Sequence, residues 1–229
     1  MTSSFHDTRW TLVARSRGGG TQAAVALSEL CEAYYAPVVA FLRREGREED
    51  AARELAHDFF AKLLAGGAIE GARPERGRFR SYLLGALKHF AADQRDKAIA
   101  AKRGGGLEQA EMDDEMADVA ADMPDAEFDR QWALTVLARS LSRMEAEMRD
   151  EGKTASFEAL KPWLTVDADA TPQAVAAERL GLSLEAVKVS IHRLRKRFRE
   201  AVKAEIAQTV SEAADVREEL DALMQALRK

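Results

Sequence analysis

The side chains best suited to chemistry lie in one segment near the C-terminal end of the chain, residues 185–203. Seven are basic and only Glu185 and Glu200 are acidic, although the whole chain carries a net charge of −5. The basic residues are Lys188, Arg193, Arg195, Lys196, Arg197, Arg199 and Lys203. Ammonium and guanidinium groups donate hydrogen bonds to phosphate oxygens, and arginine also pairs with base edges in the major groove of DNA. This segment is therefore a candidate contact for nucleic acid.

Two helices joined by a tight turn are predicted to position this segment. Thr171 and Pro172 are typical of a helix start, and Gly181 ends the first helix where a left-handed residue is favoured. Ser183 can cap the second helix, and the apolar stripe of that helix consists of Val187, Ile191, Leu194 and Phe198. A helix-turn-helix motif lays its second helix in the major groove. The alternative is an ordinary helical hairpin with a solvated basic face.

Charge is also segregated in the middle of the chain. Residues 73–103 contain nine bases and three acids, whereas residues 108–129 contain ten acids and no lysine or arginine. Two basic blocks that flank an acidic one predict two DNA-facing modules on a tether that does not itself favour DNA. We interpret the acidic stretch as a flexible linker with at most a transient helix, and mimicry of nucleic acid is the alternative for it.

An all-α fold is predicted, because helical periodicity recurs without sustained period-two alternation. Five parts are expected: an N-terminal segment (1–20), a helical domain (21–106), an acidic linker (107–126), a helix-turn-helix domain (127–208) and a C-terminal helix (209–229). The apolar stripe of the last helix consists of Val216, Leu220, Leu223 and Leu227. We expect this helix to cap the second domain, and a regulatory latch is the alternative.

Other kinds of site find little support in the sequence. Cys31 is the only cysteine and the four histidines show no clustered spacing, so we expect no disulfide, metal or cofactor. His57 and Asp58 could be taken for a metal dyad, but no further ligands accompany them. No apolar run approaches membrane-spanning length and no secretory signal appears. The expectation is a cytoplasmic protein that is not an enzyme and is monomeric when free.

Three stretches of the sequence resemble a bacterial protein family. Residues 186–195, AVKVSIHRLR, are similar to the region 4.2 pattern TVKSRLHRAR of sigma factors. Residues 78–84 and 88–90 resemble regions 2.3 and 2.4, and residues 55–64 resemble region 2.2. Over about four fifths of its length the chain is thus similar to sigma factors of the extracytoplasmic-function (ECF) type in the sigma-70 family, and to a subgroup with an added C-terminal helix.

The resemblance implies a protein that binds core RNA polymerase, recognises the minus-10 and minus-35 promoter elements and helps to open the duplex. The minus-35 element would be read in the major groove by Lys188, Ser190, His192 and Arg193. Contacts to phosphates would come from Arg195, Lys196 and Arg197. Ser190 stands where the family pattern often has arginine, so the promoter sequence does not transfer from relatives.

The minus-10 element would be captured partly as unstacked bases, which favours cationic and aromatic surfaces. The candidate residues are Arg80, Tyr82, Lys88, His89 and Arg95. We expect the basic members to face outward. Phe79 and Phe90 lie on the apolar stripe of the same helix, so we expect both rings in the core.

Region 2.2 would supply the contacts to polymerase through Arg53, Glu54, Asp58 and Lys62. The acidic patch of the family is reduced here to Glu54 and Asp58, which implies a weak contact or a supplementary charge. No Ser or Thr lies between Glu32 and Arg80, which removes the simplest phosphorylation switch at this helix. An anti-sigma factor or a Ser/Thr kinase is the expected kind of regulator. The alternative function is a helix-turn-helix regulator that binds DNA without polymerase.

Overall fold

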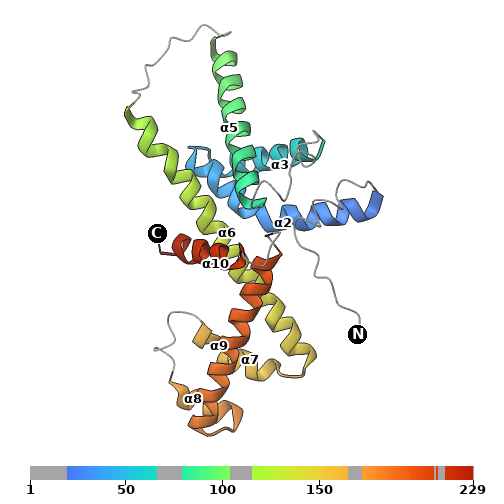
Figure 1. Cartoon of the computed structure of the whole chain (residues 1–229), viewed down its shortest axis with the longest axis vertical. Coiled ribbons are helices and arrows are strands. Elements are labelled where there is room, and N and C mark those ends of the chain that lie inside the picture. The colour runs from blue at the N-terminus through green and yellow to red at the C-terminus, as the bar shows by residue number, and fades with distance from the viewer. Residues whose placement is uncertain are drawn as a thin grey trace. The chain divides into compact units, whose positions relative to one another are not determined.

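The computed structural model describes residues 20–65, 79–103, 115–164, 172–208, 210 and 215–228. Within these ranges every regular element is a helix, so the predicted all-α fold class is confirmed (Figure 1). The chain divides into two compact units: unit 1 comprises residues 1–135 with 207–229, and unit 2 comprises residues 136–206. Thr171 and nearly all of the predicted N-terminal segment lie outside the described residues. No described helix combines the length and apolar character needed to cross a membrane.

Aromatic side chains form much of the core of unit 1. Its described helices are α2 (Gly20–Arg44), α3 (Glu49–Ala65), α5 (Phe79–Arg103), the first part of α6 (Glu115–Asp150) and α10 (Asp215–Ala226). The ring centroids of Tyr34 and Phe79 lie 5.4 Å apart, and those of Phe59 and Phe90 lie 5.5 Å apart, both in edge-on geometry. Such pairs add to the stabilisation from apolar burial. They anchor α5 against α2 and α3, and they confirm that Phe79 and Phe90 belong to the core.

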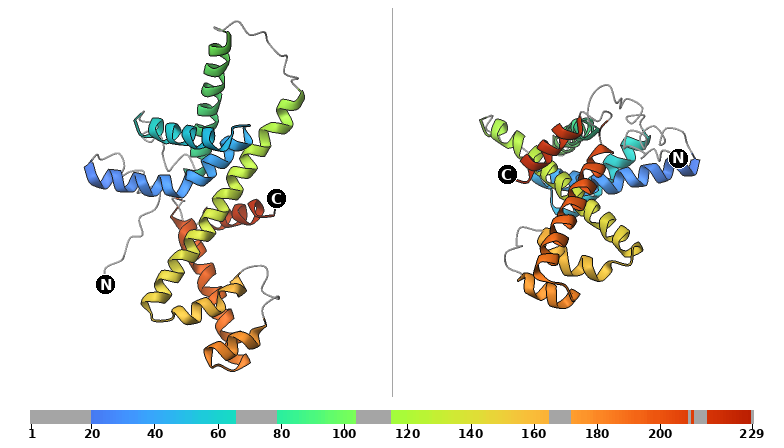
Figure 2. Two further views of the ribbon diagram at one scale, coloured as in Figure 1. Left: turned by 180° about the vertical axis from the view of Figure 1, so that it is seen from behind. Right: turned by 60° about the horizontal axis from the view of Figure 1, so that its bottom comes forward.

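Unit 2 is built around the basic helix α9. It contains the rest of α6, then α7 (Thr154–Leu160), the 3-10 helix η2 (Lys161–Leu164), α8 (Gln173–Leu180) and α9 (Leu184–Ala207). Figures 1 and 2 show α7 and α8 gathered beside α9. The predicted apolar stripe of α9 is confirmed, because Val187, Ile191 and Leu194 are buried and Phe198 packs against the same core.

Helix α6 begins inside the stretch that the sequence analysis assigned to a flexible linker. The helix starts at Glu115, so the second half of residues 107–126 is helical, while residues 104–114 lie outside the described part. Residues 115–126 contain four alanines and two methionines, which are strong helix formers. Acidic residues near the start of a helix also interact favourably with its dipole. Net charge was therefore a poor indicator of disorder here, and the boundary between the units falls within α6, after Thr135.

The C-terminal helix α10 differs from the prediction in its partner. It belongs to unit 1, so the expectation that it caps the second domain is wrong. Of its predicted stripe, Leu223 is buried and Val216 and Leu220 are partly buried, whereas Leu227 is 37% exposed. Glu219 and Ala226 are buried beside this stripe, so the inward face of α10 also carries a carboxylate.

The turn between α8 and α9 is built on Gly181, whose φ of 63° lies in the left-handed region. The N–H groups of Gly181 and Leu182 donate to carbonyl groups in the last turn of α8, which satisfies the end of that helix. Ser183 Oγ then accepts a hydrogen bond of 3.2 Å from the N–H of Ala186 and caps α9. Both the turn and the cap were predicted, and both are confirmed.

Gly181→Ala is expected to lower the free energy of unfolding of unit 2 by about 1–2 kcal/mol, because a Cβ is unfavourable in the left-handed region. Gly85→Ala is the matched control. Gly85 lies inside α5 with open space at its Cβ position, so alanine there is expected to stabilise unit 1 by about 0.5–1 kcal/mol. Native-state hydrogen exchange reports on the two units separately. Loss of stability in the control, or none in Gly181→Ala, would contradict this account.

Candidate nucleic-acid interface

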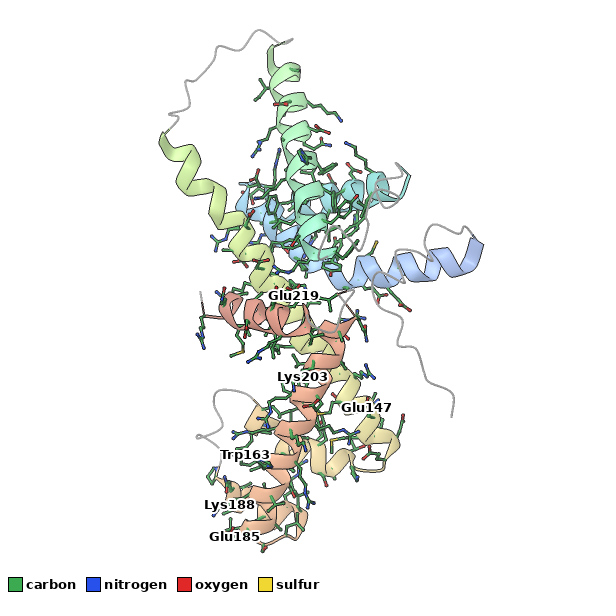
Figure 3. The ribbon with its side chains drawn as sticks, in the orientation of Figure 1. Glu147, Trp163, Glu185, Lys188, Lys203 and Glu219 are labelled. Carbon is green, nitrogen blue, oxygen red and sulfur yellow. The ribbon has the colours of Figure 1, made fainter. Side chains whose placement is uncertain are left out.

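The exposed face of α9 carries part of the basic set predicted for the minus-35 element. Lys188, His192, Arg193 and Lys196 are all exposed, on the side opposite the buried stripe. Lys188 Nζ donates to Glu185 at 2.8 Å, in an ion pair that is itself exposed. Figure 3 shows both residues at the start of α9. No ion pair joins His192, Arg193 or Lys196 to the residues that the structure describes, so these three groups are open to an external anion.

Two other predicted phosphate contacts have partners inside unit 2. Arg197 Nη2 donates to Glu147 at 3.1 Å and to Glu151 at 2.7 Å, which ties α9 to the end of α6. Arg195 Nε donates to the carbonyl oxygen of Trp163 at 2.9 Å, which ties α9 to η2. These arginines hold the helix-turn-helix together. The hydrogen bond from Arg197 is the main cause that lowers the pKa of Glu151 to about 2.

Ser190, which was predicted to read the minus-35 element, is less exposed than its neighbour Val189. Ser190 is partly buried and its hydroxyl donates to the carbonyl oxygen of Ala186 at 2.8 Å, as serine often does inside a helix. Val189 is 48% exposed and lies one helical turn before His192 and Arg193 on the exposed face of α9. Sequence analysis passed over Val189 because exposed valine carries no charge, although its spacing from His192 and Arg193 placed it on their face.

Helix α5 presents the basic residues predicted for the minus-10 element, with one exception. Lys88, His89 and Arg95 are exposed, and Lys88 and Arg95 form surface ion pairs with Asp125 and Glu45. Tyr82 is partly buried, with its ring centroid 6.2 Å from that of Phe79. Three of the five candidates therefore lie on an accessible surface of unit 1.

Arg80 is the exception, because it is 7% exposed and the expectation that it faces outward is wrong. Its Nε and Nη2 donate to the two carboxylate oxygens of Glu219 on α10, at 3.1 and 3.2 Å. Nη1 donates to Asp129, and the guanidinium lies 4.5 Å from the ring centroid of Trp132. Burial acts to lower the pKa of Arg80, but hydrogen bonds and charges from Glu219 and Asp129 outweigh it and raise that pKa.

The residues predicted to contact polymerase lie on the exposed side of α3. Glu54 and Asp58 are exposed, Arg53 pairs with Glu49, and Lys62 Nζ lies 2.9 Å from the Asp93 carboxylate on α5. The hydrogen bond from Lys62 lowers the pKa of Asp93.

His57, beside this set, stacks on Tyr35 with a centroid separation of 5.4 Å. Among the described residues no group of three or more potential ligands could hold a metal ion. His57 is therefore placed as a surface ring beside the candidate polymerase contacts.

A hollow of about 970 Å³ lies beside Arg53 in unit 1, between α2, α3 and the first part of α6. The arginines that line it are Arg43, Arg44, Arg47 and Arg53. Arg43 and Arg53 share the carboxylate of Glu49, at 3.1 and 2.5 Å, and Arg44 lies 3.7 Å from Glu127. Of these four arginines, only Arg53 was predicted from the sequence. The other three lie at the end of α2 and in the turn before α3, and the fold brings them near Arg53.

No protein-family model, curated protein or solved structure matches the chain. The exposed chemistry of the helices is therefore the guide to function. On α9 and α5 it includes hydrogen-bond donors and positive charges, which suit an anionic partner, whereas α3 exposes Glu54 and Asp58 as well as Arg53 and Lys62.

Arg197→Gln is expected to raise the pKa of Glu151 from about 2 toward its ordinary 4.5. Because the folded-state pKa is depressed, the stabilisation is present above about pH 4.5 and is lost as the pH falls toward 2. Wild type and variant should therefore differ in stability at neutral pH and converge near pH 2. NMR titration of the Glu151 carboxyl group and acid unfolding measure the two effects.

Arg193→Gln is the control for this substitution, because Arg193 has no carboxylate partner among the described residues. It should leave both the titration of Glu151 and the acid stability unchanged. A wild-type pKa near 4.5 for Glu151, or equal effects of the two variants, would show that Arg197 does not hold α9 to α6.

Proposed function

We propose that the chain is a sigma factor of the ECF type, which directs core RNA polymerase to promoters and helps to open the DNA. The observation that carries the proposal is the division of α9 into a buried apolar stripe and an exposed face with Lys188, His192, Arg193 and Lys196. A helix-turn-helix with such a face suits the major groove. The similarity to sigma regions 2 and 4 narrows DNA binding to promoter recognition.

In this proposal α9 reads the minus-35 element. Arg193 pairs with a guanine edge, as a guanidinium does with O6 and N7, and Lys188 neutralises a phosphate. Lys188 has to leave Glu185, which costs little because exposed ion pairs contribute about 0–1 kcal/mol. Arg195 and Arg197 keep their partners in unit 2 and hold α9 in place.

Unit 1 supplies the second set of DNA contacts and the contact with polymerase. Lys88 and His89 on α5 suit the backbone and unstacked bases of the minus-10 element. Glu54 and Asp58 on α3 suit a basic surface of polymerase. Promoter recognition and DNA opening both take place on the chromosome, so the proposed protein is cytoplasmic. The proposal also includes a protein that is not an enzyme, has no cofactor and is monomeric when free.

Binding to core RNA polymerase and transcription from a promoter library test the proposal together. The wild-type chain should bind the core enzyme and direct initiation. Arg193→Ala should leave core binding unchanged and reduce initiation about tenfold, because a good base contact contributes about 1–3 kcal/mol. Arg149→Ala removes an exposed arginine from α6 and is the control, which should change neither core binding nor initiation. Binding to a palindrome without polymerase, and no initiation with it, would identify an independent regulator instead.

Val189 is expected to read a thymine through its methyl group, because apolar side chains contact the C5-methyl of thymine in the major groove. Promoters selected by the wild-type chain should keep one thymine that those selected by Val189→Ser lose. Replacing that thymine with deoxyuridine, which lacks the methyl group, should weaken binding by wild type about fourfold, since burial of one such group contributes about 0.8 kcal/mol. Val189→Ser should be insensitive to the replacement. Equal sensitivity of the two proteins would remove Val189 from the reading face.

A further inference from the structure

The Arg80 cluster joins the C-terminal helix to the helix that we assign to the minus-10 element. Glu219 on α10 receives two parallel hydrogen bonds from Arg80 on α5, and both side chains are buried. Figure 3 labels Glu219 on the side of α10 that faces the rest of unit 1. The separation along the chain is 139 residues, so this contact is purely tertiary.

The ion pair lies on the inward face of α10, beside the apolar side chains of that face. Glu219 is fully buried, whereas Met224 and Leu227 remain 47% and 37% exposed. A helix that docked only through apolar contacts would turn its leucine and methionine side chains inward. The helix instead buries a carboxylate, which is unfavourable unless a charged partner and hydrogen bonds compensate for lost water. Arg80 supplies both.

The ion pair adds to the apolar contacts that attach α10. The helix has 12 residues, and helices of that length are marginal in water without tertiary contacts. Its buried apolar side chains are Leu223 and Ala226, and Val216 and Leu220 are partly buried beside them. Since this apolar face is short, the pair with Arg80 is a substantial part of the attachment.

The ligand that Glu219 imitates is a phosphate group. Two parallel N–H···O bonds from a guanidinium are the geometry in which arginine binds carboxylate and phosphate alike. Arg80 lies on α5, the helix that also exposes Lys88, His89 and Arg95. A strand of nucleic acid along that surface would place phosphates near a cation that is now held by a carboxylate of the same chain.

We propose that Arg80 is a phosphate-binding site for single-stranded nucleic acid and that Glu219 on α10 occupies it until DNA displaces the helix. The proposal rests on the proposed function and deepens it, since it makes α10 an internal competitor for the minus-10 contact. Asp129 and Trp132 remain beside Arg80 in both states and keep its side chain in position. Displacement exchanges one bidentate oxyanion for another, and no covalent step is involved.

Glu219→Gln tests the competition in the free, full-length protein, with a fluorescent single-stranded DNA of 20 nucleotides and random sequence as the probe. The variant should bind this DNA about tenfold more tightly than wild type, and its affinity should fall more steeply with salt, by the slope of about 0.7 that one added phosphate contact gives. The double variant Arg80→Ala, Glu219→Gln should lose both gains.

Asp221→Asn is the matched control, because it removes one negative charge from an exposed position on the same helix. It should leave affinity and salt slope near the wild-type values. Equal gains in Asp221→Asn and Glu219→Gln would show a general charge effect and would overturn the proposal. A lower unfolding temperature for Glu219→Gln without tighter binding would identify the pair as a structural tie only, and would also overturn it.

Hydrogen exchange of the wild-type chain provides a test that does not depend on any variant. Addition of the same single-stranded DNA should deprotect amides of α10 while those of α3 keep their protection. Unchanged or increased protection of α10 in the bound state would contradict displacement. Displacement of α10 by DNA without initiation by polymerase would reject only the sigma-factor function. Initiation by polymerase without any effect of Glu219→Gln would reject only the competition between Glu219 and DNA.

Discussion

The cost of removing a charged group from water decides which basic residues of this chain remain available to a partner. Of the arginines with internal partners, Arg80 is buried and is held by carboxylates, as a buried guanidinium requires. Arg197 is only partly buried and Arg195 is exposed, yet both are held by hydrogen bonds within unit 2. A surface cation needs none, and Arg193 and Lys196 remain in water. The same residue type therefore serves two purposes, and the presence of a partner within the same unit separates arginines that hold a unit together from those that can meet DNA.

Periodic patterns made much of the fold predictable. The spacing of apolar residues from Val187 to Phe198 located the buried face of α9, and Gly181 with Ser183 located the turn and cap before it. These signals are local: each depends on the chemistry of a few neighbouring residues and needs no knowledge of the rest of the chain. The exposed face of α9 followed from its buried face by geometry, so half of the candidate site was available from sequence.

The remaining features were missed for separate reasons, one of which is a contact between residues far apart in the chain. Nothing near Arg80 indicates that Glu219 will reach it, and the apolar pattern of α10 gave no sign that a carboxylate is buried on the same face. The acidic composition of residues 107–126 suggested disorder, whereas helix propensity prevailed from Glu115 onward. Val189 escaped notice because an exposed valine is chemically silent until its neighbours are known. Apolar periodicity and net charge therefore did not reveal the partner of Arg80, the helix that begins at Glu115 or the role of Val189.

Hydroxyl-radical footprinting of a selected promoter, with the chain alone and with the chain bound to core RNA polymerase, distinguishes a sigma factor from an independent regulator. Two separate basic helix surfaces, α5 and α9, are assigned to two unlike DNA elements. The account predicts protection of both elements at a fixed separation only when polymerase is present, with weak and uniform protection by the chain alone. Protection of a single symmetric site by the chain alone, unchanged by polymerase, would contradict it.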